Sequence, residues 1–323
     1  MKKGTKEYRL ANIKEMQSWT LDKKINHSLK RIEEFYKKMD GKVYIAFSGG
    51  KDSCVLKHLV ESIHKEVISV FSNTTNETIE ILKHVKSTEN VITVHPKMTF
   101  NDTVKEYGFP LVSKKVSRSI YDLRNPTVNN KASRNLYMTG IKRDGTISKN
   151  FKLSKKWHFL VDEDFDITNK CCYILKKEPL ERFQKETGLF PIVGTQVGES
   201  DQRKMSWLQV GCNNFDGNQI KSQPLSIWTE KNIWEYIERF DVPYSSIYDD
   251  KLDSNGNVIV EGEKRTGCAY CAFGAHLEKS DIFHKNRFER LKLRKPKQFE
   301  SMMNLKNNGV TFREALSKVG VRT

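Results

Sequence analysis

The sequence contains no run of about 18 consecutive apolar residues, so it predicts no membrane-spanning helix. Its first residues, Met1-Lys2-Lys3-Gly4, lack the apolar stretch of a secretory leader. Internal repeats and low-complexity tracts are also absent. We therefore expect a cytoplasmic protein with no membrane partner, in a compartment where thiols stay reduced.

Cysteine is scarce, with six among 323 residues, and 37% of the chain is hydrophobic. That is enough apolar material for one large α/β domain with appendages or for two domains. In a reducing compartment we expect the thiols to be metal ligands or core residues rather than disulfides. Cys54 and Cys212 lie in no ligand motif, and we expect both to be buried core residues.

Acidic residues are fewer than basic residues, which gives the chain a formal net charge of +16. The excess is concentrated in residues 111–160, where twelve Lys or Arg, such as Lys114 and Arg134, face only Asp122 and Asp144. Such a segment attracts polyanions, so a nucleic-acid partner is one hypothesis. A solvated basic face that favours a small anionic substrate is the other.

The most informative motif is Ser48-Gly49-Gly50-Lys51-Asp52-Ser53. It follows an apolar run at 43–47 that predicts a buried strand, and it precedes a helical face containing Val55, Leu56, Leu59, Val60 and Ile63. A glycine turn at a helix N-terminus directs backbone N–H groups and the helix dipole at one point. The motif therefore predicts a phosphate-binding loop, although its spacing is not that of GxxxxGK[ST]. An ordinary Gly-Gly turn is the alternative.

Apolar segments alternate with helical patterns along much of the chain, as in repeated βα units. We expect further strands at 67–71, 91–94 and 191–194, another strand before Pro224, and a helix capped by Thr229. Residues 1–40 are predicted to be helical, with Ile25, Leu29, Ile32 and Tyr36 on one apolar stripe. The fold class is therefore α/β, a parallel twisted sheet with helices on both faces.

Polar segments interrupt or follow this pattern. Residues 110–165 have few periodic apolar positions, and we interpret them as a basic insertion facing the substrate. We expect three segments: an N-terminal helical segment (1–40), a nucleotide-binding domain (41–275) that contains the insertion, and a basic helical tail (276–323).

Four cysteines have the spacing of a metal site. Cys171 and Cys172 are adjacent, and Cys268 and Cys271 form a CxxC motif. Four thiolates can hold a tetrahedral zinc or a [4Fe–4S] cluster, and spacing alone does not choose between them.

Taken together, these motifs resemble the phosphoadenylyl- and adenylyl-sulfate reductase family of the ATP-pyrophosphatase superfamily. The loop is similar to its pyrophosphatase loop, Cys171-Cys172 with Lys176 and Pro179-Leu180 to its "CC…K-x-x-PL" segment, and residues 224–244 to its "PL-x-x-WT…PY" block. The resemblance covers about residues 41–275 and implies an adenine-nucleotide alpha-hydrolase-like fold.

The resemblance also implies site residues. Ser48, Gly49, Gly50 and Ser53 would grip pyrophosphate, Lys51 would offset its charge, and Asp52 would hold Mg²⁺. Arg203 would act in catalysis with Lys51 and Asp52. Other nucleotide contacts would come from Gly194, Ser200 and the segment 72–77, with Thr75 and Glu77. That segment resembles "NTG-x-E" only in part, because Asn76 rather than Gly follows Thr75; a polar helix cap is its alternative. The ligands of a [4Fe–4S] cluster would be Cys171, Cys172, Cys268 and Cys271.

The sequence differs from the reductases at two positions, but its phosphate-binding loop is complete. No cysteine follows Cys271, where the family has a redox cysteine in an "ECG[LI]H" segment. Gln196 stands where the reductases place an arginine that holds the phosphosulfate. The SGGKDS loop, in contrast, is intact, as in enzymes that adenylate a substrate with ATP.

We therefore expect a sulfurtransferase that uses ATP to adenylate an acceptor, with sulfur arriving through the cluster from a donor protein. The basic insertion fits a nucleic-acid acceptor. One alternative is a reductase that makes sulfite from adenylyl sulfate (APS) or phosphoadenylyl sulfate (PAPS), which takes electrons from a donor. The other is a non-catalytic nucleotide- or nucleic-acid-binding module with a structural metal.

Overall fold

A computed structural model describes residues 6–148, 150–217, 219–281 and 284–323, and the chain divides into two compact units. Unit 1 consists of Met1–Asn73, Thr78–His95 and Pro179–Tyr248. Unit 2 consists of Thr74–Glu77, Pro96–Glu178 and Asp249–Thr323. The chain therefore passes from one unit to the other five times.

Unit 1 is built on a six-stranded sheet with the strand order β3-β2-β1-β4-β6-β5. The pairs from β3 to β6 are parallel, and only the edge strand β5 runs antiparallel to its neighbour. The α/β fold class with a mostly parallel sheet is therefore confirmed. The strands are β1 (Val43–Ala46), β2 (Ser69–Ser72), β3 (Val91–Val94), β4 (Phe190–Val193), β5 (Asn213–Asn214) and β6 (Lys221–Ser222).

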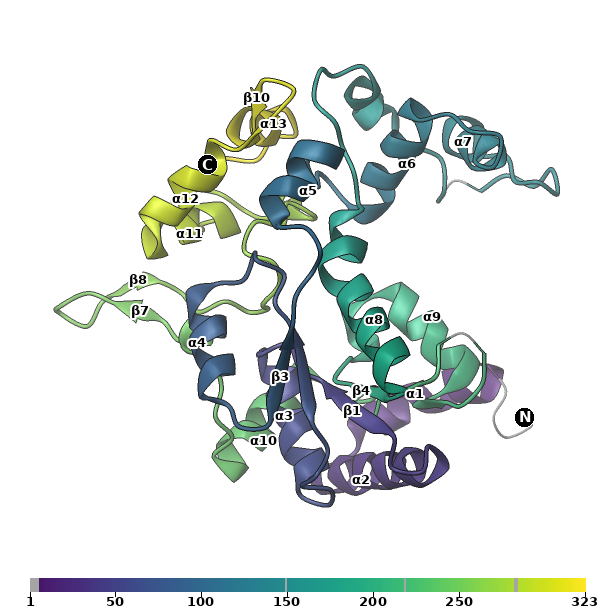
Figure 1. The fold of residues 1–323 in the computed structure, drawn as a ribbon, viewed down its shortest axis with the longest axis vertical. Helices are drawn as coiled ribbons and strands as arrows, with labels where there is room; N and C mark the ends of the chain where they lie inside the picture. Colours follow the sequence, from purple (N-terminus) through teal and green to yellow (C-terminus); the bar gives the residue numbers. More distant parts are fainter. Residues whose placement is uncertain (1–5, 149, 218, 282–283) are drawn as a thin grey trace. The chain divides into compact units, whose positions relative to one another are not determined.

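Helices cover both faces of this sheet, because alternate strand residues point in opposite directions. Val43 and Ile45 enter the main core with Ile32 and Leu56, whereas Tyr44 packs on the other face against Phe183. Figure 1 shows the central strands with these helices around them. The helices of unit 1 are α1 (Lys6–Ser18), α2 (Leu21–Lys38), α3 (Lys51–Glu61), α4 (Ile79–Ser87), α8 (Glu178–Thr187, whose first residue belongs to unit 2), α9 (Asp201–Val210) and α10 (Glu230–Phe240).

The strand order reverses its direction at β1. The chain moves from β1 outward to β2 and β3, and later returns to the opposite side of β1 as β4. In open α/β sheets ligands bind beyond the carboxyl ends of the strands at such a switch point. The loop after β1 and the residues after β4 are therefore where a ligand of unit 1 is expected.

Most sequence predictions for unit 1 are confirmed at the level of elements. The strands appear where they were expected, and Thr229 caps α10 by accepting from Asn232 N at 3.4 Å. One detail was wrong: Ile63 does not lie on the buried face of α3, because the helix ends at Glu61 and Ile63 is 41% exposed. Cys54 and Cys212 are buried as expected.

Unit 2 has its own core of aliphatic and aromatic side chains, in which Phe109 stacks on Phe312 at 5.1 Å between ring centroids. No helix in the described part of the chain is long and apolar enough to cross a membrane. The elements of unit 2 are α5 (Phe100–Tyr107), α6 (Lys114–Arg124), α7 (Lys131–Thr139), β7 (Lys251–Leu252), β8 (Val258–Val260), α11 (Arg287–Arg294), α12 (Pro296–Met303), β9 (Lys306–Asn307), β10 (Val310–Thr311) and α13 (Phe312–Lys318), with a 3-10 helix at Lys155–Val161 and a π-helical turn at Tyr173–Lys177.

The basic segment 110–165 contains two α-helices that its weak apolar periodicity did not reveal. The reason is that serines occupy part of the buried face: Ser117 and Ser119 are buried beside Ile120 in α6. Ser117 Oγ donates to Leu111 O at 2.6 Å, and Ser119 Oγ donates to Lys115 O at 2.9 Å. These bonds satisfy the buried hydroxyls, so the helix buries polar residues where a simple hydrophobic pattern would require apolar ones.

Candidate functional site

The loop Ser48–Ser53 joins β1 to α3 and has a backbone shape that glycine makes possible. Gly49 has φ of +70°, in the left-handed region, and a Cβ there would lie 2.8 Å from Val85 Cγ2. Gly50 caps α3 without a side chain. The loop can therefore pass close to α4, and no Cβ of Gly49 or Gly50 blocks the approach of a ligand.

The two serines of the loop hold its shape. Ser53 Oγ donates to Gly50 O at 2.7 Å, and it also accepts from Ser48 N at 3.2 Å. The Ser48 and Ser53 hydroxyls are themselves 3.2 Å apart. Both hydroxyls are thus gathered at the N-terminus of α3, where the helix dipole favours an anion.

Lys51 is buried in an aromatic setting that the sequence did not reveal. Its backbone N donates to Tyr248 Oη at 3.1 Å, and its ammonium lies 5.0 Å from the Tyr248 ring and 5.8 Å from the Trp234 ring. Glu230 Oε1 lies 3.5 Å from the ammonium. The cation is therefore held beside the loop, and Tyr248 is a site residue that only the folded chain identifies.

The residues after β4 are linked to the loop through Gln196. The Gln196 amide donates to the Asp52 carboxylate, and a Cβ at Gly194 would lie only 3.0 Å from Asp52 O. Gln196 N in turn donates to Glu199 Oε2 at 2.9 Å, and Glu199 pairs with Arg203. The structure thus brings Gly194 and Arg203, through this chain of contacts, into one arrangement with the loop.

Ser200 has a structural function in this arrangement. Its hydroxyl accepts from Arg203 N at 3.2 Å and caps α9.

The four motif cysteines come together in unit 2. The pKa of Cys171 is raised by the hydrogen bond to Cys172 and by burial, with further contributions from the charges of Cys271 and Cys268. The hydrogen bond from Cys171, together with the ammonium groups of Lys114 and Lys176, lowers the pKa of Cys172 to about 6. All four thiols therefore lie within electrostatic reach of one another.

Cys171 and Cys172 lead into the π-helical turn Tyr173–Lys177, an irregularity that is frequent at functional sites. Burial disfavours the ammonium of Lys176, but Cys268, Glu77 and Cys271 outweigh this effect and raise its pKa. Lys176 is therefore, with Lys114, a cation that accompanies the thiols.

The segment Thr74–Glu77 is part of the cysteine site. Ala269 N donates to Asn76 O at 2.7 Å, and Tyr270 N donates to Asn76 Oδ1 at 3.1 Å. Thr74 Oγ1 donates to Glu77 Oε1 at 2.7 Å and lies 3.9 Å from Cys268 Sγ. Thr75 and Glu77, which the resemblance assigned to the nucleotide, thus belong to unit 2.

Thr75 occupies a conformation that β-branched residues rarely adopt, with φ of +60°. Its hydroxyl accepts from Phe100 N at 2.9 Å, which accounts for a threonine at this position. The left-handed position favoured by glycine is therefore Thr75 and not Asn76.

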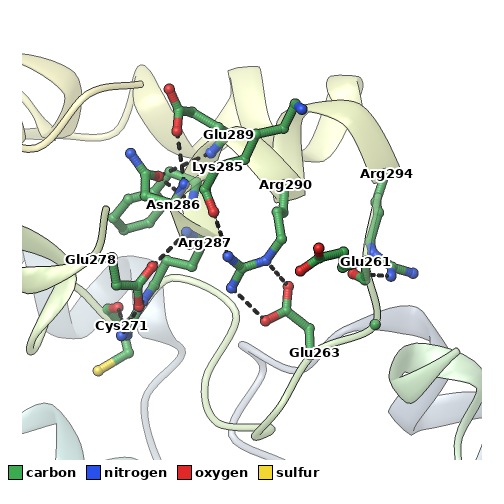
Figure 2. A network of polar contacts seen from close by, with 12 residues as sticks. Glu261, Glu263, Cys271, Glu278, Lys285, Asn286, Arg287, Glu289, Arg290 and Arg294 are labelled. Carbon is green, nitrogen blue, oxygen red and sulfur yellow. Dashed lines mark hydrogen bonds and ion pairs between the residues drawn. The ribbon is translucent and has the colours of Figure 1, made fainter. Parts of the chain in front are cut away.

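Arg287 on α11 hydrogen-bonds the backbone of the CxxC segment. Its Nη1 donates to Cys271 O at 2.8 Å and to Phe273 O at 3.2 Å, while its Nε donates to Glu278 Oε1 at 2.7 Å. Figure 2 shows the Cys271 sulfur turned away from Arg287, whose guanidinium faces the carbonyl. These hydrogen bonds fix one side of the CxxC backbone. They do not involve the thiols, which can bind a ligand.

The thiol set fits an iron–sulfur cluster in its chemistry. Thiolates are the ligands of such clusters, and the nearby cation Lys176 offsets the negative charge that four of them carry. Within the described ranges, no three Cys, His, Asp or Glu side chains converge as ligands of one metal ion do. A cluster gives each thiolate its own iron, so its ligands need not converge on one centre.

Comparison with known proteins gives one family. The model of the phosphoadenosine phosphosulfate reductase domain matches residues 42–118 and 119–271. An uncharacterized protein of Methanocaldococcus jannaschii is 26% identical over 249 residues, which cover 74% of this chain and 38% of that protein. The chain thus spans less than two fifths of the length of that relative.

Further matches include proteins that carry a functional name. An adenosine 5'-phosphosulfate reductase of Bacillus cereus is 24% identical over 220 residues, which cover 66% of this chain and 70% of that protein. The crystal structure of a phosphoadenylyl-sulfate reductase from Candida auris, a phosphate complex, aligns with a TM-score of 0.40 at 15% identity, over 78% of this chain and 97% of that one.

Proposed function

Because the chain belongs to the phosphoadenosine phosphosulfate reductase domain family, we propose that it is an ATP-dependent sulfurtransferase. Unit 1 binds ATP at Ser48–Ser53, and unit 2 holds a [4Fe–4S] cluster on Cys171, Cys172, Cys268 and Cys271. The observation that carries the proposal is that an intact phosphate-binding loop at a sheet switch point accompanies four gathered thiols in one chain.

The proposed reaction has two displacements. An acceptor oxygen attacks the α-phosphorus of ATP, the bond to the bridging oxygen breaks, and pyrophosphate leaves with the electron pair. Hydrosulfide from a donor protein then displaces AMP from the adenylated acceptor, so one oxygen is exchanged for one sulfur without net oxidation or reduction. A [4Fe–4S] cluster held by Cys171, Cys172, Cys268 and Cys271 would supply iron–sulfur chemistry for this second step.

The residues of unit 1 serve the first displacement. The hydroxyls of Ser48 and Ser53 and the dipole of α3 stabilise the leaving pyrophosphate, and Lys51 neutralises its growing charge. Asp52 is the Mg²⁺ ligand in this scheme, with Gln196 orienting its carboxylate through the amide hydrogen bond. In this scheme Arg203, which pairs with Glu199, supplies a further cation, and Gly194 is a secondary nucleotide contact. Ser200 positions Arg203 at the start of α9.

The experiment is anaerobic purification of the full chain, followed by metal analysis and incubation with ATP and nucleic acids. We expect about four irons and four acid-labile sulfides per chain, and release of pyrophosphate. Lys51→Met should slow pyrophosphate release by roughly 100-fold or more while iron is retained. Cys268→Ser should lose iron, whereas Cys54→Ser, which removes a buried thiol outside the set, should keep it.

Two outcomes would contradict the proposal. Zinc without labile sulfide would favour the non-catalytic module with a structural metal. Sulfite from APS or PAPS, with no pyrophosphate from ATP, would favour the reductase, which the naming of the Bacillus cereus relative supports.

The reductase alternative needs an attacking thiolate, and the chain's remaining thiols are poorly suited to provide it. Burial raises the pKa of Cys54 to about 12, and burial also raises the pKa of Cys212. A reductase with this sequence would therefore need an attacking thiol from outside residues 1–323.

A further inference from the structure

Within unit 2 the basic segment forms a helix, a turn, a second helix and a short hairpin. α6 and α7 are joined by residues 125–130, and Ile141 then pairs with Ile147 in an antiparallel bridge. Lys142 N donates to Thr146 O at 2.9 Å to close the hairpin. Figure 1 shows α7 nearly along its axis, beside α6, with the hairpin extending from it.

The outward side of α7 and the hairpin tip carry groups suited to a nucleic acid. Lys131, Asn135 and Met138 follow one another at i, i+4 and i+7 and are exposed, so they form one stripe. Lys142 and Arg143 are exposed at the tip of the hairpin.

Exposed apolar groups accompany these charges. Ile147 of the hairpin is 74% exposed, and Val128 in the turn before α7 is 92% exposed. Apolar side chains at such positions can contact base edges such as the thymine methyl.

Negative charge is nearly absent from this surface. In the described parts of 111–160, the one exposed carboxylate is Asp144, and its Oδ1 accepts from Thr146 N and Oγ1 at 3.0 and 2.6 Å. Asp122 is half-buried beside Arg118. Seven further exposed cations in these parts are Lys115, Lys131, Lys142, Arg143, Lys152, Lys155 and Lys156, so exposed positive charge far exceeds exposed negative charge.

This surface is connected to the cysteine site by α6 itself. Lys114, at the start of α6, hydrogen-bonds Cys172, and the far end of α6 leads into the turn before α7. An eleven-residue helix is about 16 Å long. Lys170, next to Cys171, donates to Tyr121 Oη in the C-terminal half of α6 at 2.6 Å, so a second contact joins α6 to the segment of Cys171.

We propose that α7 and the hairpin Ile141–Ile147 bind duplex DNA, with α7 in the major groove and Lys142 and Arg143 on the phosphates. This inference rests on the proposed function, because it names the class of the acceptor. The major groove of B-DNA is about 12 Å wide and admits an α-helix, whereas that of A-form RNA is too narrow. The amide of Asn135 matches the hydrogen-bonding edge of adenine.

The test is binding of the full-length protein to a labelled 20-base-pair duplex, without ATP, over a range of salt concentrations. Removing two phosphate contacts with Lys142→Ala/Arg143→Ala should reduce the slope of log K against log salt by about 1.8. At 0.1 M salt this corresponds to a binding constant that is lower by roughly 60-fold. The matched control is Lys30→Ala/Lys38→Ala, two exposed cations of α2 in unit 1, which should leave the slope unchanged. Asn135→Ala should change the sequence preference and leave the slope unchanged.

Equal slopes for the hairpin variant and the wild type would overturn the inference. Tighter binding of single-stranded DNA or folded RNA than of the duplex would overturn it as well. If either occurs while nucleic acid still stimulates pyrophosphate release, the proposed function stands without this surface. If the duplex binds through the hairpin but no acceptor yields pyrophosphate, the surface stands and the proposed function fails. Unchanged thermal unfolding of the hairpin variant shows that it is folded.

Discussion

The two candidate sites differ in how far their shape depends on distant segments of the chain. The loop of unit 1 is one continuous segment, whose shape comes from Gly49, Gly50 and hydrogen bonds between neighbours. The cysteine site of unit 2 draws on segments separated by up to two hundred residues, which Asn76 and Arg287 tie to the CxxC backbone. A local site depends on backbone conformation, whereas an assembled site depends on the whole unit being folded. Mutations should therefore affect the two sites differently.

The largest loss of stability is expected at Gly108 in unit 2, where a side chain would overlap the backbone. Gly108 has φ of +90°, and a Cβ there would lie 2.0 Å from Asp166 O, which is backbone and cannot move aside. Gly108→Ala should destabilise unit 2 by about 4 kcal/mol or more. The measurement is chemical unfolding followed through Trp157, the one tryptophan of this unit.

Gly145→Ala is the matched control for that change. Gly145 also has a positive φ, of +78°, but nothing lies within 4 Å of its Cβ position. Only the left-handed strain should remain, about 1–2 kcal/mol. Equal effects of the two substitutions would show that the backbone clash at Gly108 is absorbed by movement.

The next effect concerns the assembly of the cysteine site. Arg287→Ala removes the donors to Cys271 O and Phe273 O and leaves Glu278 without its cation. Because hydrogen bonds to charged groups contribute about 1.5–3 kcal/mol, the CxxC segment should loosen and iron retention should fall several-fold. Iron per chain after desalting measures this loss.

Arg294→Ala on the same helix provides the comparison. Arg294 donates to Asp249 O and Glu261 O, and Figure 2 shows it apart from Cys271. Its removal should leave the iron content unchanged. Equal iron loss in both variants would mean that α11 as a whole, and not the Cys271 contact, supports the site.

A smaller and more local effect is expected in the loop. Gly49→Ala places a methyl group 2.8 Å from Val85 Cγ2 at a positive φ, so ATP affinity should fall roughly tenfold, equivalent to about 1.4 kcal/mol. Global stability should change less than it does for Gly108→Ala. Isothermal titration with ATP gives the affinity.

The second variant for the loop is Gly49→Ala/Val85→Ala. Removing the Val85 side chain relieves the contact but not the backbone strain, so part of the affinity should return. If the double variant binds no better than Gly49→Ala, the contact with α4 is not the cause of the loss.

The smallest expected effect is a difference in acid sensitivity between the units. Burial, with Arg31 and Lys30, lowers the pKa of His27 to about 4, and burial also lowers the pKa values of His58 and His84 in unit 1. These histidines bind protons more readily when unfolded, so their stabilisation is complete above pH 6.5 and declines as the pH falls toward 4. In unit 2 only His276 shows such a lowered pKa within the described residues.

Unit 1 should therefore lose stability first between pH 6.5 and 4. Parallel unfolding curves, with Trp157 for unit 2 and the remaining tryptophans for unit 1, measure the difference. His27→Gln should flatten the pH dependence of unit 1. The same slope in wild type and variant would assign the acid sensitivity to other groups.

Sequence reasoning identified the features that neighbours in the chain determine. The strands, the loop and the Thr229 cap could be predicted because alternation and capping are local signals. The buried position of Lys51 under Tyr248 could not, since that contact joins residues almost two hundred positions apart.

The same limit applies to unit 2. Lys114 and Arg287 gave no signal as partners of the cysteine site, because their type is ordinary and only the folded chain places them there. At Thr75 the sequence showed a polar turn, but its left-handed backbone depends on the hydrogen bond with Phe100. The helices of residues 110–165 were not predicted, because buried serines occupy positions where apolar residues are expected.

The interleaved connectivity has a consequence for biosynthesis. In the finished sheet β1 lies between β2 and β4, but β4 follows β3 only after residues 96–178 have been made. At 5–20 residues per second the ribosome spends roughly 4 to 17 s on that stretch. During this time β1 is an edge strand, with backbone groups open to pairing by another nascent chain. Slow codons or stalling within residues 96–178 would lengthen that exposure, so translation rate there should influence the yield of soluble protein.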